Sequence, residues 1–157
     1  FEKLGLIIGG TAADGRRMKE RFLARNPLLA ELIEGVRTAS RKGYVVGIDG
    51  RRIKMRRDKV TGRVLEHKAL NLLNQGCGAI VMKYSMVLLD KWVTQRNLDA
   101  TKVIDMHDEA QAEVHPDDVE EYGELACESI REAGRQLGLR CPLDAEYKVG
   151  NNWSETH

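Results

Sequence analysis

The chain has 157 residues, of which 42% are hydrophobic and 31% are charged, a composition typical of one globular domain and not of a disordered segment. No run of about 18 apolar residues predicts a membrane span, and the first residues lack a signal-peptide pattern, so a secreted or membrane protein is not expected. The three cysteines have no zinc-site spacing and are expected to be reduced thiols of a cytoplasmic protein: Cys77, Cys127 and Cys141.

The net charge of +1 hides an uneven distribution of charge along the chain. Residues 41–63 contain nine Lys and Arg residues and two acids, whereas residues 99–146 contain fourteen acids and four bases. This asymmetry indicates either one face for polyanions and another for cations, or two solvated faces of opposite sign.

Two helices are expected in the first part of the chain. Asp14 is a candidate cap for a helix over residues 15–25. The dipeptide Asn26-Pro27 combines a cap with a proline at the first helical position, and the helix that it opens should end at Gly43.

The segment YVVGIDGRRIKM follows these helices and consists of two short β-prone runs around Asp49-Gly50. This dipeptide predicts a hairpin with a two-residue turn. Most of the basic cluster would lie on its second strand and in the loop beyond.

The longest helical pattern runs from about Glu66 to Trp92. A stripe of residues at 4-3-4-3 spacing is expected to face the core: Leu73, Cys77, Ile80, Tyr84 and Val87. A different face carries His67, Asn71 and Gln75, which are four residues apart and therefore lie one above the other. Two glycines beside them, Gly76 and Gly78, indicate either the close approach of another part of the chain or solvent exposure.

Residues 101–114 contain IDMHDEAQAE, a predicted hairpin in which acids are concentrated. The apolar side chains share one face only if Met106 lies opposite Ala110 and Ile104 lies opposite Ala112. That register predicts a three-residue loop over 107–109, without the glycine that such loops usually contain.

The adjacent carboxylates of Asp108 and Glu109 at this tip repel each other, and Asp105 and Glu113 on the other face add to the repulsion. A bound cation would remove this conflict. Mg²⁺ suits the pattern because it takes one or two carboxylates together with substrate phosphates. The hairpin therefore predicts a Mg²⁺ site that is completed by a phosphate-bearing substrate.

The last third of the chain is expected to hold a helix that starts at His115-Pro116-Asp117 and ends at Gly138. A short strand near 143–149 would then lead to the final GNNWSETH. These elements predict an α+β fold, with a mainly helical body and small antiparallel β hairpins.

Four segments, in this order, resemble motifs of the family A DNA polymerases, the group of bacterial DNA polymerase I and of podophage replicative enzymes. They are GIDGRRIKMR (47–56), HKALNLLNQGCGAI (67–80), HDE (107–109) and GNNWSETH (150–157). The histidine four residues before Asn71 is similar to the phage branch. Together the four segments extend over most of the chain.

The resemblance implies that the chain is the C-terminal part of a polymerase domain, with residues 1–43 from the end of the fingers and residues 44–157 from the palm. The other catalytic aspartate and the nucleotide-binding fingers helix would lie in a preceding part, either of the same chain or of a second subunit. The complete protein would be a DNA-directed DNA polymerase, a nucleotidyltransferase of a bacterial or phage-infected cell. Its partners would be primer-template DNA and dNTPs, and the isolated chain is expected to be inactive.

The resemblance also assigns roles to residues. Asp108 would bind Mg²⁺ and Glu109 would support that site, while His107 would lie near the primer terminus. Amide side chains would contact bases in the minor groove, and arginines would hold backbone phosphates. These DNA-binding residues are Asn71 and Gln75 with His67 beside them, and Arg51 with Arg52. Asp105 and Met106 depart from the residues more usual in the family, and Asp105 leaves the number of metal ligands open.

Two other functions are compatible with these residues. The chain could be a polymerase remnant that binds nucleic acid without catalysis, although carboxylates near phosphate would not help a pure binding module. A metal-dependent nuclease built on the acidic hairpin would need a second carboxylate motif and a general base, for which the sequence offers no candidate.

Overall fold

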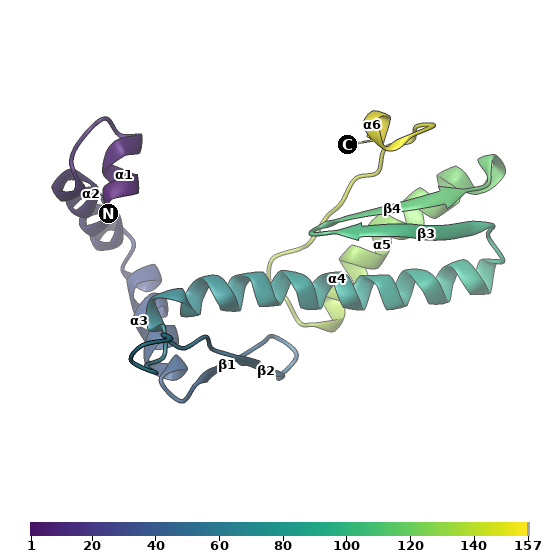
Figure 1. The fold of residues 1–157 in the computed structure, drawn as a ribbon. Coiled ribbons are helices and arrows are strands. Elements are labelled where there is room, and N and C mark those ends of the chain that lie inside the picture. Colours follow the sequence, from purple (N-terminus) through teal and green to yellow (C-terminus); the bar gives the residue numbers. More distant parts are fainter. Residues whose placement is uncertain (157) are drawn as a thin grey trace. The chain divides into compact units, whose positions relative to one another are not determined.

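The computed structural model describes residues 1–156 of the chain (Figure 1). Its helices are α1 (Glu2–Ile7), α2 (Ala12–Arg25), α3 (Pro27–Ser40), α4 (Ala69–Arg96), α5 (Val119–Gln136) and α6 (Trp153–Thr156), with 3₁₀ turns η1 (Glu66–Lys68) and η2 (Pro116–Asp118). The strands form two two-stranded sheets: β1 (Tyr44–Val46) with β2 (Arg52–Lys54), and β3 (Ala100–Met106) with β4 (Glu109–Val114). The predicted α+β fold, mainly helical with small β hairpins, is confirmed.

The chain divides into two compact units. Residues 1–45 and 54–72 form one unit, and residues 46–53 together with those from Leu73 onward form the other. Buried residues of the first unit include Val45, Met55 and Ala69, and those of the second include Ile80 and Ala133.

The two predicted N-terminal helices are α2 and α3, and their caps differ in detail from the prediction. Thr11, not Asp14, is the N-cap of α2: its hydroxyl accepts a hydrogen bond from the Asp14 amide, and the Asp14 carboxylate accepts one from the Thr11 amide (2.7 Å). Asn26 and Pro27 start α3 as predicted. The Asn26 side chain, however, donates to the Phe22 carbonyl at the end of α2 instead of capping α3.

The predicted hairpin around Asp49-Gly50 is present, but its loop covers residues 47–51 instead of two residues. Gly50 has φ +84°, a left-handed conformation that favours glycine. The Asp49 carboxylate accepts hydrogen bonds from the Arg51 amide (3.2 Å) and from Arg51 Nε (2.6 Å). These bonds fold the loop back on itself and account for its greater length.

The long helix is α4, entered through η1. Ile80 faces the interior as predicted, but Val87 is 71% exposed, so its assignment to the core is wrong. A strict 4-3-4-3 spacing corresponds to 3.5 residues per turn, and such a stripe drifts around a straight helix of 3.6 residues per turn. By Val87 the stripe has moved out of the covered side, which at this level holds the buried Ser85.

By length and composition alone, residues 66–96 are long and apolar enough to cross a membrane, with a mean hydropathy of 1.2 over 18 residues. This test tolerates polar residues and up to two charged ones in its window, so it does not contradict the absence of an unbroken run of about 18 apolar residues. Core helices of globular proteins pass it as well, and this stretch carries Lys83, Asp90 and Lys91.

The helix predicted to start at His115-Pro116-Asp117 is η2 followed by α5, and it ends before Gly138, which has φ +66°. The strand predicted near 143–149 is wrong, because this segment is irregular. Residues 140–149, here called the C-terminal strap, instead place side chains against glycines of α5. A Cβ at Gly123 would lie 2.4 Å from the Tyr147 ring, and a Cβ at Gly134 would lie 3.0 Å from Leu143 Cγ.

Candidate functional site

The acidic hairpin β3–β4 is present, but its predicted register is wrong. Met106 pairs with Glu109, Asp105 with Ala110 and Ile104 with Gln111, which leaves a two-residue loop, His107 and Asp108. A bulge between Lys102 and Ile104 then changes the parity, so that Lys102 pairs with Ala112. Sequence parity alone cannot anticipate an extra residue of this kind.

His107 makes the tight loop possible. Its φ is 56°, in the left-handed region, where non-glycine residues are uncommon and histidine is among the more tolerated. Asp108, the other residue of the loop, does not adopt it. Non-glycine residues held in this region concentrate at functional sites, so the strained histidine marks the tip as a candidate site.

The two predicted catalytic acids have different surroundings. Asp108 is exposed, and its carboxylate has no hydrogen bond or ion pair within the described residues. Glu109 is half-buried, and its Oε1 accepts hydrogen bonds from Gln111 Nε2 (2.5 Å) and from Trp153 Nε1 (3.1 Å). The first carboxylate is therefore presented to solvent, while the second is held in place by the protein.

Asp105 is not part of this cluster. Its carboxylate pairs with Lys102 Nζ at 2.8 Å, and it lies on the face of the hairpin that carries Ala110 and Ala112, opposite the face of Glu109. Burial of Tyr122 in α5 raises the pKa of that residue, and the nearby charge of Asp105 raises it further. Lys102 therefore offsets the charge of Asp105, the carboxylate that the sequence analysis left open as a further metal ligand.

The metal-binding capacity of the chain is limited. No group of three His, Cys, Asp or Glu side chains suited to a metal ion occurs among residues 1–156. Asp108 and Glu109 are hard oxygen donors on consecutive residues, and Mg²⁺ is often held by one or two carboxylates plus substrate phosphates. The tip thus fits part of a Mg²⁺ site, not a complete one.

The predicted DNA-facing residues of the long helix are accessible. Asn71 and Gln75 are exposed and four positions apart on α4, so their amides lie one above the other, and His67 is exposed in η1 just before the helix. Within residues 1–156 these polar side chains have no hydrogen bond or ion pair, which leaves them available to a ligand.

The basic hairpin β1–β2 sits against the same helix. A Cβ at Gly76 would lie 2.5 Å from Ile53 Cδ1, and a Cβ at Gly47 would lie 2.8 Å from Ile80 Cδ1. Of the two interpretations of these glycines, close approach of another segment holds for Gly76, whereas Gly78 has open space around it. Because Arg52 precedes Ile53 and Gln75 precedes Gly76, this contact places the two polar residues next to one packing point.

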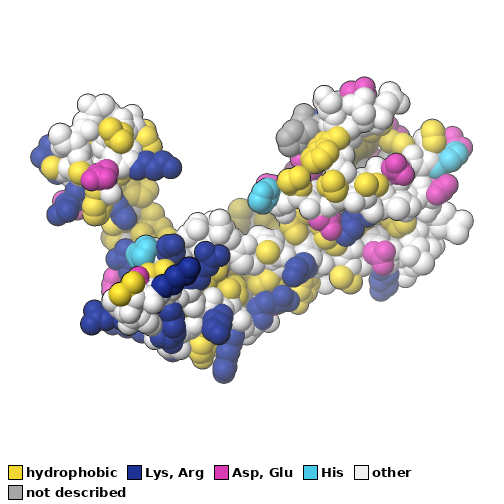
Figure 2. Space-filling model, in the orientation of Figure 1, with side chains coloured by type: hydrophobic (Ala, Val, Ile, Leu, Met, Phe, Trp, Pro, Cys, Tyr) yellow, Lys and Arg dark blue, Asp and Glu magenta, His cyan; other side chains and the backbone are white. Residues whose placement is uncertain are grey.

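The arginines of this hairpin are exposed, and Arg51 has an acidic partner. Arg51 Nε lies 2.6 Å from the Asp49 carboxylate, which is largely buried. Burial of the Asp49 side chain opposes the change, but hydrogen bonds and the charge of Arg51 together lower the pKa of Asp49. Figure 2 shows Lys and Arg side chains gathered over the β1–β2 part of the chain, and the exposed ones include Arg51, Arg52, Lys54, Arg56, Arg57, Lys59 and Arg63.

Trp153 and Gln111 are contacts of the site for which the sequence analysis gave no role. The tryptophan lies in GNNWSETH, a segment that was noted only as a motif, and it is 44 residues from Glu109. A buried or half-buried carboxylate needs donors, and an indole N–H is one of the few available. That need was the only signal in the sequence.

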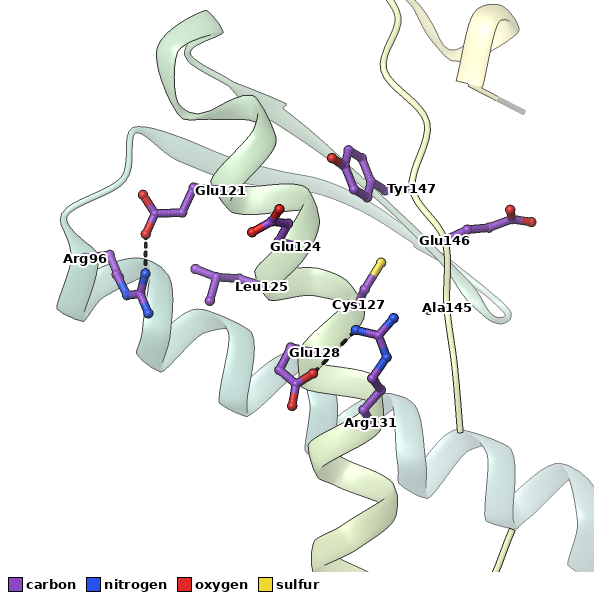
Figure 3. Close-up of a pocket in the computed structure, with 10 residues that line it drawn as sticks. All are labelled: Arg96, Glu121, Glu124, Leu125, Cys127, Glu128, Arg131, Ala145, Glu146 and Tyr147. Atoms are coloured by element: carbon purple, nitrogen blue, oxygen red, sulfur yellow. Dashed lines mark hydrogen bonds and ion pairs between the residues drawn. The ribbon is translucent and has the colours of Figure 1, made fainter. Parts of the chain in front are cut away.

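The second unit has a pocket of about 650 Å³ on α5, beside the C-terminal strap (Figure 3). It contains ion pairs of Arg96 with Glu121 and of Arg131 with Glu128. None of the site residues predicted from the sequence lines it.

Comparison with known proteins gives a consistent result. The sequence model of DNA polymerase family A matches residues 2–155. The DNA-directed DNA polymerase of Escherichia phage Phieco32 is 47% identical over 99% of this chain and 25% of its own length. DNA polymerase I of Pseudomonas aeruginosa is 33% identical over 96% of this chain and 17% of its length.

A solved structure shares the fold. The POL domain of Pol1 from M. smegmatis, in complex with DNA primer-template and dNTP, matches with a TM-score of 0.72 and 23% identity, covering 91% of this chain and 25% of that one. The chain thus spans about a quarter of the length of the phage relative and of the mycobacterial structure. As the four sequence motifs indicated, the chain belongs to DNA polymerase family A.

Proposed function

We propose that the chain is the C-terminal part of a template-dependent DNA polymerase that adds dNTPs to the 3′ end of a primer. Residues 1–43 would belong to the fingers and residues 44–157 to the palm. The observation that carries the proposal is the exposed Asp108 carboxylate at a strained two-residue hairpin tip, next to a braced Glu109, in a chain of this family. The relatives are named as DNA-directed DNA polymerases.

Family A polymerases are metal-dependent enzymes, and we propose Mg²⁺ as the cofactor. Asp108 would bind it, with phosphate oxygens of the substrate and a carboxylate from the preceding part of the polymerase as further ligands. When bound, Mg²⁺ ions neutralise developing charge and hold the attacking and leaving oxygens in line.

The reaction is the attack of the primer 3′-hydroxyl oxygen on the α-phosphorus of the dNTP, with loss of pyrophosphate. Asp108 supplies negative charge at the tip, where the reacting groups are brought together. Glu109 supports that position from a fixed orientation. His107, whose backbone conformation sets the shape of the loop, lies next to the primer terminus.

The remaining site residues bind the duplex. The Asn71 and Gln75 amides donate hydrogen bonds to minor-groove acceptors, with His67 beside them; these acceptors differ little between base pairs, so the contact checks pair shape without reading sequence. Arg51 and Arg52 bind backbone phosphates, which supply affinity but no sequence information.

A non-catalytic DNA-binding role is less well supported. The exposed Asp108 carboxylate, which has no partner among residues 1–156, repels phosphate and would weaken a pure binding surface. As a polymerase, the protein would work inside a bacterial or phage-infected cell, the source of its named relatives.

A chimera tests the proposed function. In the phage Phieco32 polymerase, the quarter that matches this chain is replaced by residues 1–157. With Mg²⁺ and four dNTPs, the chimera should extend a primed template as the parent enzyme does. A chimera that binds primer-template as tightly as the parent but does not extend it would contradict the proposal.

A further inference from the structure

The Glu109 carboxylate accepts hydrogen bonds from donors in different parts of the chain. Gln111 Nε2 comes from the same strand, and Trp153 Nε1 comes from α6; both donate to Oε1. Thr156 of α6 in turn donates through Oγ1 to Gln111 Oε1 at 3.1 Å. Two residues of α6 therefore contact two residues on one face of β4.

The segment that leads to α6 is fastened to α5. The Arg131 guanidinium lies 2.7 Å from Asp144, and the Tyr147 hydroxyl donates to Glu120 at 2.8 Å, so the C-terminal strap is tied to α5 at two points. The hydrogen bond to Glu120 raises the pKa of Tyr147, which keeps its hydroxyl protonated as a donor. The strap thus gives α6 a fixed attachment to the body of its unit.

The turn of α6 is itself held by local bonds. The Glu155 carboxylate accepts hydrogen bonds from the Asn151 amide (2.7 Å) and from Asn152 Nδ2 (2.6 Å). Trp153 is 41% exposed, so burial of its ring does not by itself explain why its N–H is directed at Glu109.

We propose that Trp153 is a positioning residue of the active site, which acts by holding the Glu109 carboxylate. The inference rests on the proposed polymerase function. Glu109 directly follows Asp108, and the loop before it contains the strained His107. An anchored Glu109 limits the conformations of the tip and so keeps the Asp108 carboxylate where the metal and the substrate meet.

The first test measures the contact in the 157-residue chain, without any need for activity. Tryptophan is labelled with ¹⁵N, and the two indole N–H signals, from Trp92 and Trp153, are followed by NMR. Glu109→Ala should shift the Trp153 signal and speed its exchange with solvent, while the Trp92 signal stays unchanged. An unchanged Trp153 signal would overturn the inference.

The second test measures positioning in the active chimera. Trp153→Phe keeps an aromatic ring and removes the donor, and Trp92→Phe is the matched control. We expect kcat to fall about tenfold with Trp153→Phe, as for other residues that orient a metal ligand, at unchanged affinity for primer-template. Gln111→Met removes the second donor and should also lower kcat.

A double-mutant cycle separates positioning from a general structural role. If Trp153 acts through Glu109, then Trp153→Phe should cause no further loss in a Glu109→Ala background. An equal loss in both backgrounds, or a loss of thermal stability with unchanged kcat, would overturn the inference. An unsubstituted chimera without activity would instead contradict the proposed function. The NMR test of the contact between Trp153 and Glu109 would remain valid, because it does not require activity.

Discussion

The arrangement of the acids at the hairpin tip depends on local backbone geometry that residue types alone do not reveal. The residue types of the site could be read from the sequence, because carboxylates crowd together there without basic neighbours in the loop. Their arrangement could not, because it depends on the left-handed His107 and on the bulge before Ile104. Lys102 likewise removes Asp105 from the cluster only once the register is known.

We predict that substitution of Asp108 lowers catalysis without lowering the stability of the chain. Asp108→Asn keeps the size of the side chain and removes its charge, so primer extension by the chimera should fall by about three orders of magnitude or more. Affinity for primer-template should be nearly unchanged. In the 157-residue chain the melting temperature should stay equal or rise slightly, because repulsion with Glu109 is relieved.

An acid retained only to cap the turn would give the opposite pattern. The variant would then melt at a lower temperature and still polymerise. Primer extension by the chimera and thermal melting of the chain, each with and without Asp108→Asn, distinguish the two roles.

Among the elements, those defined by local signals were predictable. Caps, prolines and terminal glycines identified α3 and α5, the turn residues Asp49-Gly50 identified the first hairpin, and the alternation of apolar side chains indicated the second. The C-terminal strap was mistaken for a strand because its conformation depends on Tyr147 and Leu143 meeting Gly123 and Gly134 of α5, contacts that no local pattern reveals. The core stripe predicted on α4 is wrong at Val87 for a related reason, because the elements that pack against a helix decide which of its sides is buried.

The strap contact can be tested with a pair of glycine substitutions. Gly123→Ala places a Cβ 2.4 Å from the Tyr147 ring and should destabilise the chain by about 1–3 kcal/mol. Gly78→Ala, in open space on α4, should be neutral or stabilise it by up to about 1 kcal/mol. Chemical denaturation measures both, and equal effects of the two substitutions would contradict the packing role of Gly123.

The basic hairpin should bind DNA through charge alone. In the 157-residue chain, each phosphate contact contributes a slope of about −0.9 to log affinity against log salt concentration. Arg52→Ala and Arg51→Ala should therefore each reduce the slope by at most about 0.9, and for Arg51 the Asp49 carboxylate at 2.6 Å already offsets part of the charge.

Fluorescence anisotropy with labelled duplexes between about 50 and 200 mM salt measures these slopes. Arg140→Ala, an exposed arginine within the acidic part of the sequence, is the control and should change nothing. A strong preference for one duplex sequence, or identical effects of all three substitutions, would contradict the assignment of Arg51 and Arg52 to backbone phosphates.

For the whole molecule, the family could be inferred from four short motifs because they extend over most of the chain in a fixed order. The division into two compact units could not, because the β1–β2 hairpin contributes residues to both, so the boundary does not follow the order of the chain. The share of the relatives that the chain covers, 25% of the phage polymerase, means that most of such a protein lies outside these residues.

This share leads to a prediction about the chain on its own: it should not extend a primed template. Two-metal phosphoryl transfer needs carboxylates that bind both ions, and residues 1–156 offer one exposed acid at the tip and no three-ligand group. With Mg²⁺ and four dNTPs, a labelled primer should remain at its original length, while the phage Phieco32 polymerase, as positive control, extends it. Asp108→Asn identifies a contaminating host polymerase, whose activity it would leave unchanged. Template-dependent extension by the purified chain that Asp108→Asn abolishes would show that residues 1–157 contain a complete active site, and the assignment of the chain to one part of a larger catalytic domain would then be wrong.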